Sequence, residues 1–149
     1  MLKFGIVTNI NEKNATARVQ FQEDDGVASD WLPILQVKTL RDKFYILPDI
    51  GEQVACLMDE NLEDGVILGA IYSAEDVCPV FSKDKIIAKF QDGSNIEINK
   101  SAGDLSISFN NIKLNGKFIL NGVDVVKLFN AHNHNETNSV TQAPNQRLI

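Results

Sequence analysis

Two histidines, His132 and His134, are the residues whose type and spacing most clearly suggest chemistry, and the chain has no others. In an extended segment, residues i and i+2 point to the same side, so both imidazoles would face one way. Imidazole nitrogen is a common metal ligand, and the pair could therefore help to hold a metal ion. The alternative is two solvated histidines in a polar tail, because residues 135–149 are rich in Asn, Thr and Gln.

A catalytic role for this pair is not predicted. The string His132-Asn133-His134 invites comparison with nucleases, but their motif spreads its residues over a ββα unit, and nothing after His134 indicates a helix or further ligands. Ser/His/Asp, Cys/His and phosphate-loop arrangements are also missing from the sequence. Two cysteines make no disulfide framework, and we interpret Cys56 as a buried apolar residue and Cys78 as a connector residue. A metal-dependent enzyme is therefore kept only as a weak alternative.

The stretch that must position the histidines is a series of six short strand patterns. Each alternates apolar and polar residues, which gives a strand one apolar and one polar face. The six patterns cover residues 85–90, 94–98, 105–109, 112–115, 117–120 and 123–125, with turn signals between them. No amphipathic helix of useful length lies nearby to cover the apolar faces. Since a small sheet with one bare apolar face is unstable in water, we predict that copies of this stretch meet on a shared axis as a β-stalk.

The N-terminal half predicts a small closed barrel. Its strand patterns cover residues 4–10, 15–22, 31–35, 43–48, 52–58 and 65–72. Short strands in some 70 residues that close on themselves are the content of an OB-type barrel. The predicted fold class is all-β, with an OB-fold domain at residues 1–76, a linker at 77–82, an oligomeric β-stalk at 83–126 and a C-terminal segment with the two histidines at 127–149.

Composition argues against several classes of function. The net charge of −6 opposes binding to a polyanion, and the 14 Lys and Arg residues are scattered. An OB-fold nucleic-acid-binding module is the alternative function, but it needs a basic groove and stacking aromatics. The aromatics considered for this role fall mostly in core-like patterns: Phe4, Phe21, Trp31, Phe44 and Tyr45. We expect no nucleic acid, no small-molecule substrate, no membrane span and no signal peptide, with synthesis in the cytoplasm.

Four features, in this order, give the chain a family resemblance. They are the opening Gly5-Ile6-Val7-Thr8, the Pro-x-x-Gly-Glu turn within residues 47–54, the glycine-containing strand 65–72, and a short-strand stalk ending in a His-x-His tip before a Thr-x-x-Pro segment at 141–144. No single feature is specific, but their order is. The chain resembles the baseplate assembly protein V or central spike family of contractile-tailed, Mu-like phages and related tail-like particles.

The resemblance implies a homotrimer in the virion, at the tip of the tail baseplate, where it contacts baseplate hub and tail tube proteins. In such a trimer, residues 83–126 would form an intertwined β-helix and residues 127–149 a metal-binding tip. Its pointed end would lead the tube through the outer membrane of the target cell. In family members with this tip, the histidines of three chains bind one iron ion, which here implies His132 and His134. Six imidazole nitrogens suit iron or nickel better than zinc and leave no open position, which indicates a structural metal. Residues 135–140 lack the glycines common in family tails.

Overall fold

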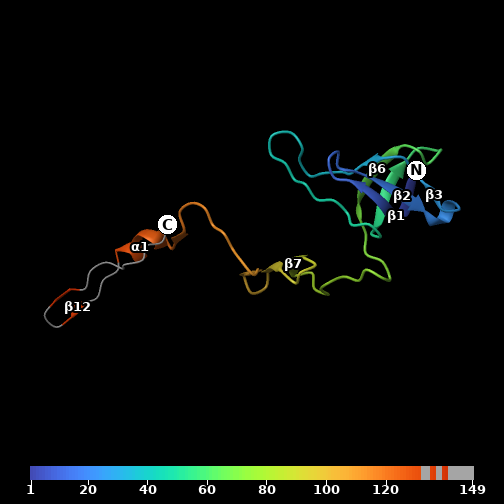
Figure 1. Cartoon of the computed structure of the whole chain (residues 1–149). Coiled ribbons are helices and arrows are strands. Elements are labelled where there is room, and N and C mark those ends of the chain that lie inside the picture. The colour runs from blue at the N-terminus through green and yellow to red at the C-terminus, as the bar shows by residue number, and fades with distance from the viewer. Residues whose placement is uncertain (132–134, 137–138, 141–149) are drawn as a thin grey trace. The chain divides into compact units, whose positions relative to one another are not determined.

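The computed structural model describes residues 1–131, 135–136 and 139–140. The chain divides into two compact units, Met1–Ser82 and Lys83–Ile149. In Figure 1 the first unit runs from blue to green and the second from yellow to red.

The N-terminal unit is a closed β-barrel. Its strands are β1 (Leu2–Asn11), β2 (Thr16–Phe21), β3 (Val27–Ala28), β4 (Leu32–Pro33), β5 (Gln53–Met58) and β6 (Gly65–Ala70), with the 3-10 helix η1 (Gln22–Asp24) after β2. The antiparallel order is β3-β2-β1-β5-β6, and β4 also pairs with β2. A parallel bridge between Ile34 and Ile67, with the Leu35 N–H donating to the Ile67 carbonyl at 2.9 Å, links the end of β4 to β6. This bridge closes the barrel.

Apolar side chains at alternate positions of the strands fill the barrel interior. Every second residue of β2 and β5 points inward, as the period of two requires. The core consists of Val7, Ala17, Val19, Phe21, Leu32, Val54, Cys56, Met58 and Ile67, and none of them is more than 4% exposed. The prediction of a buried Cys56 is confirmed. At Gly5 a β-carbon would lie 2.5 Å from Cγ1 of Val19, so the close contact of β1 with β2 requires glycine.

The predicted strand at residues 43–48 is wrong. No strand forms between β4 and β5, and residues 35–52 make a long loop. The Gln36 side chain explains this, because its amide donates to the Ile46 carbonyl at 2.9 Å and accepts from the Ile46 N–H at 3.2 Å. These side-chain bonds occupy backbone groups that a strand ladder would use.

The expectation that the aromatics lie in the core is also wrong for four of the five. Phe21 is buried, whereas Phe4, Trp31, Phe44 and Tyr45 are between 43% and 60% exposed. Phe44 and Tyr45 lie in the long loop, and Phe4 lies on β1 between inward-facing positions. The argument against nucleic-acid binding therefore rests on the acidic charge alone.

The C-terminal unit begins with a three-stranded antiparallel meander. Strands β7 (Lys85–Lys89), β8 (Asn95–Asn99) and β9 (Asp104–Ser108) pair in chain order, as the first three stalk patterns predict. Beyond them, the patterns at 117–120 and 123–125 shrink to β10 (Ile119–Leu120) and β11 (Val123–Asp124), which pair across an Asn121-Gly122 turn with positive φ at both residues. Residues 112–115 form no strand, contrary to prediction.

A short helix, α1 (Val125–Asn130), follows β11 and was not predicted. Asp124 starts it, because its carboxylate accepts from the Lys127 N–H at 3.1 Å and so caps the helix N-terminus. Strands β12 (Asn135–Glu136) and β13 (Ser139–Val140) form a final pair. The described part of the chain is therefore mostly β rather than purely β, and within it no helix is long and apolar enough to cross a membrane.

Candidate functional site

The two predicted metal ligands, His132 and His134, lie outside the described residues, as does the Thr-x-x-Pro segment at 141–144. Within residues 1–131, 135–136 and 139–140, no group of three or more His, Cys, Asp or Glu side chains could hold a metal ion. The described structure instead offers two surfaces. One is a face of the β7-β8-β9 sheet, and the other is a hollow on the barrel.

Strand register gathers the apolar residues of the sheet on one face. Ile98 of β8 lies opposite Ile86 of β7 and Leu105 of β9, and the next row places Ala88, Ile96 and Ile107 side by side. Phe90 and Phe109 extend the face beyond the strand ends, with ring centroids 5.7 Å apart. We call this set the apolar sheet face; its members are Ile86, Ala88, Phe90, Ile96, Ile98, Leu105, Ile107 and Phe109.

The apolar sheet face is open to solvent in the single chain. Each of its seven large side chains is between 37% and 61% exposed. The opposite face is polar except for Ile87, and it carries an ion pair between Lys85 and Glu97 with 2.8 Å between Nζ and Oε1. Among residues 83–131, the one buried residue is the polar Ser94. A contiguous apolar patch beside a polar face marks an interaction surface.

Turn side chains fix the register that assembles this face. At the β7–β8 turn the Asp92 carboxylate accepts from the Ser94 hydroxyl at 2.7 Å and from the Ser94 N–H at 2.9 Å. These hydrogen bonds hold the pKa of the Asp92 carboxyl below its usual value. At the β8–β9 turn, the Asn99 side-chain oxygen accepts from the Ser101 hydroxyl at 2.8 Å. A slip of one residue would turn every apolar side chain to the other face, so these turns preserve the surface.

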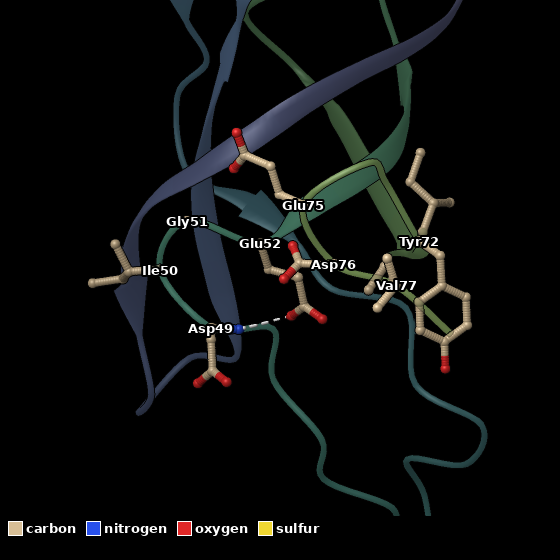
Figure 2. A pocket seen from close by; sticks show the side chains of 10 residues that line it. Asp49, Ile50, Gly51, Glu52, Tyr72, Glu75, Asp76 and Val77 are labelled. Atoms are coloured by element: carbon tan, nitrogen blue, oxygen red, sulfur yellow. Dashed lines mark hydrogen bonds between the residues drawn. The ribbon is translucent and has the colours of Figure 1, made fainter. Parts of the chain in front are cut away.

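The second surface is a hollow on the barrel, shown in Figure 2. One wall is the predicted turn, in which the Glu52 N–H donates to the Asp49 carbonyl at 3.1 Å and Gly51 has a φ of 94°. The Glu52 carboxylate also accepts from the Asp49 N–H at 2.9 Å. The other wall is the segment after β6. We call this surface the acidic hollow; it is lined by Asp49, Ile50, Gly51, Glu52, Ala70, Ile71, Tyr72, Glu75, Asp76 and Val77.

The acidic hollow has the composition of a docking surface rather than an active site. Its lining includes four carboxylates but no His, Cys, Ser or Lys side chain that could act as nucleophile or base beside them. Sequence reasoning identified the turn at Asp49–Glu52 but not the hollow, because the facing segment lies some twenty residues further along the chain. Neither described surface carries a catalytic constellation.

Comparison with known proteins agrees with these structural features. Residues 3–72 match the family model described as "Type VI secretion system/phage-baseplate injector OB domain". The chain is also similar to the spike protein of Escherichia phage P2, with 30% identity over 109 residues. That alignment covers 72% of this chain and 50% of the relative, so the chain matches about half of the relative's length.

Strands β2, β1, β5, β6 and β4 form a closed five-stranded barrel, which is the architecture of the OB fold. Residues 3–72 are therefore similar over their whole length to the injector OB domain of phage baseplates and type VI secretion systems. This confirms the resemblance drawn from the sequence.

Proposed function

We propose that this protein is the central spike of a contractile tail or tail-like particle, a homotrimer whose C-terminal half winds into an intertwined β-helix. The observation that carries the proposal is the apolar sheet face, whose large side chains are all at least 37% exposed in the single chain. Burying the exposed part of each would gain about 1 kcal/mol, or roughly 7 kcal/mol per copy before the cost of association. This free energy of burial favours assembly of the sheets from several copies.

Three copies provide a simple closed arrangement. Three sheets can turn their apolar faces toward a common axis and leave their polar faces, with the Lys85–Glu97 ion pair, toward water. Closure around the axis also removes the open strand edges of β7 and β9, which would otherwise be free to pair with other chains. The number three comes from the family resemblance and not from the single-chain geometry. The result would be a stiff, narrow needle.

The tip would be held by iron. His132 and His134 of three copies supply six imidazole nitrogens, a donor set that suits octahedral iron and leaves no site for a substrate. The proposal rests on this donor chemistry and on the position of the histidines after the stalk. Because metal binding favours the ordered state, iron would stabilise the tip beyond the end of the apolar sheet face.

The mechanical role follows from this assembly. The needle would cross the outer membrane of the target cell while the force comes from sheath contraction elsewhere in the particle. Its partners would be baseplate hub and tail tube proteins, as expected for a baseplate component. The curated relative carries the name spike protein, which supports this role.

The test combines molar mass with metal content in one sample. Light scattering should report three times the chain mass of 16.5 kDa, and elemental analysis of the same fraction should find one iron per trimer. Replacing both histidines, His132→Ala with His134→Ala, should remove the iron and leave the barrel folded by circular dichroism. A monomeric mass would overturn the trimer, and equal iron in the double variant would overturn the metal site alone.

A further inference from the structure

The long barrel loop presents an exposed surface that the proposed stalk does not explain. We define the barrel loop as residues 36–46, which carry Lys38, Arg41 and Lys43 against a single acid, Asp42. Its large apolar side chains are strongly exposed: Val37, Leu40, Phe44, Tyr45 and Ile46 are all between 52% and 85% accessible. In a chain with net charge −6, this cationic and apolar segment stands out.

The barrel loop is held in a defined conformation. Gln36 joins its two ends through the pair of hydrogen bonds to Ile46. Within the loop, the Phe44 N–H donates to the Lys38 carbonyl at 3.0 Å. The Tyr45 hydroxyl donates to the Glu12 carbonyl in the β1–β2 turn at 2.9 Å, which ties the loop to the barrel. A surface fixed in advance loses little entropy on docking.

The acidic hollow of the same chain has the complementary character. Its rim carries the carboxylates Asp49, Glu52, Glu75 and Asp76. Its apolar side chains Ile50, Tyr72 and Val77 are each at least 65% exposed. No residue of the barrel loop lines the hollow of its own chain. Each copy thus offers a cationic apolar projection and, separately, an anionic concave surface with exposed apolar groups.

We propose that the barrel loop of one copy docks into the acidic hollow of a neighbouring copy. Because the two surfaces differ, the contact is heterologous, and repetition around a rotation axis closes it into a ring. The inference rests on the proposed trimer and adds to it a contact between barrels. Apolar burial would supply most of the affinity, while Arg41 and Lys43 facing the carboxylate rim would fix orientation. A second copy is the occupant that the charges favour, since both halves of the match lie in one sequence.

The test is disulfide cross-linking in the full chain. Cys78 directly follows Val77, which lines the hollow, so Cys78→Ser is introduced into every variant, while Cys56 stays buried in the core. Arg41→Cys and Glu75→Cys are then made singly and together. Mild oxidation should convert the double variant to covalent dimers and trimers. In each chain, the loop cysteine would face the hollow of one neighbour, and the hollow cysteine would face the loop of the other neighbour. Neither single variant can form the cross-link between loop and hollow, so each serves as a matched control.

Charge reversal tests whether electrostatics orient the contact. Added to the double-cysteine variant, Lys43→Glu should slow cross-linking about fivefold, the effect expected from losing one or two surface ion pairs. A further Asp76→Lys should restore the rate by exchanging the signs of the pair. Restoration requires the two positions to be near each other, which a general loss of folding would not reproduce.

The outcomes separate this contact from the trimer itself. Light scattering on the same samples before oxidation gives the oligomeric state independently of the cross-link. A trimeric mass with no cross-linked species would overturn the loop–hollow contact and leave the spike proposal standing. Cross-links confined to single chains would overturn it as well, whereas a monomeric mass would remove the trimer on which it rests.

Discussion

One substitution pair tests the apolar sheet face directly. Ile107 and Ser108 are neighbours on β9 and point to opposite faces of the sheet. Ile107 lies on the apolar sheet face and is 50% exposed, and Ser108 is exposed on the polar face. Ile107→Asp should prevent assembly, and Ser108→Asp should not. Both add the same carboxylate to the same strand, so the difference reports which face is buried.

The magnitude follows from the burial of a carboxylate. Losing the half-exposed isoleucine removes about 1 kcal/mol of apolar burial per copy. Keeping an aspartate neutral at pH 7, about three units above its usual pKa, costs about 4 kcal/mol more. The penalty is then about 5 kcal/mol per copy and about 15 kcal/mol per trimer, which is comparable to the gross gain of the whole face. Such a loss should leave the variant monomeric.

The assay is light scattering across a pH series. At pH 7 the wild type and Ser108→Asp should have three times the chain mass of 16.5 kDa, and Ile107→Asp should have the mass of one chain. Burial disfavours the charged form, so the carboxyl pKa is higher in the trimer than in the monomer. Assembly of Ile107→Asp should therefore recover as the pH falls toward about 4. A trimeric Ile107→Asp at pH 7 with unchanged melting would refute the assignment of this face.

Three further predictions concern the barrel and are measured by denaturant unfolding or thiol labelling. Ser29→Ala should lower the free energy of unfolding by about 1–3 kcal/mol, because the buried Ser29 hydroxyl accepts from the Val19 N–H at 3.0 Å. Gly5→Ala should cost about 1–3 kcal/mol through overpacking against β2, and it is contradicted if stability is unchanged. Burial raises the pKa of the Cys56 thiol to about 11 from 9.0, so the free energy of unfolding should fall between pH 9 and 11, where the thiol ionises in the unfolded chain but not in the folded one. Thiol labelling of the native protein should modify the less buried Cys78 before Cys56.

Much of the fold could be predicted where the strand period alone decides the outcome. Ile96 and Ile98 alternate with polar residues, and the structure places them in the middle of one apolar face. The turns at Asp92-Gly93 and Asn121-Gly122 also lie where the sequence indicated them, since positive φ favours glycine and asparagine. In these segments local chemistry and tertiary structure agree.

Two of the failures have a common cause in side-chain bonds to the backbone. Residues 43–48 contain Phe, Tyr and Ile and resemble a strand, but the Gln36 amide satisfies Ile46 and the segment becomes a loop. Residues 125–130 give no helix prediction because six residues are too few for a clear helical period, and the cap from Asp124 determines where the helix starts. The acidic hollow joins segments distant in sequence, which no local pattern reveals. Both histidine predictions lie outside the described residues and stay predictions.

The two units differ in what their apolar residues do, and this difference carries the functional argument. The barrel buries nine apolar side chains within its own strands, which gives it an interior as a single chain. The β7-β8-β9 sheet has a comparable number of apolar residues on one face but no layer of its own against them in the described structure. Since alternation is strict on β8 and β9 and β7 departs from it only at Ile87, the exposed face is a specified feature of the sequence and not incidental surface hydrophobicity. An exposed apolar face of this kind requires a binding partner. Other copies of the same chain can be that partner, because they are present at equal concentration and carry the same face in matching register.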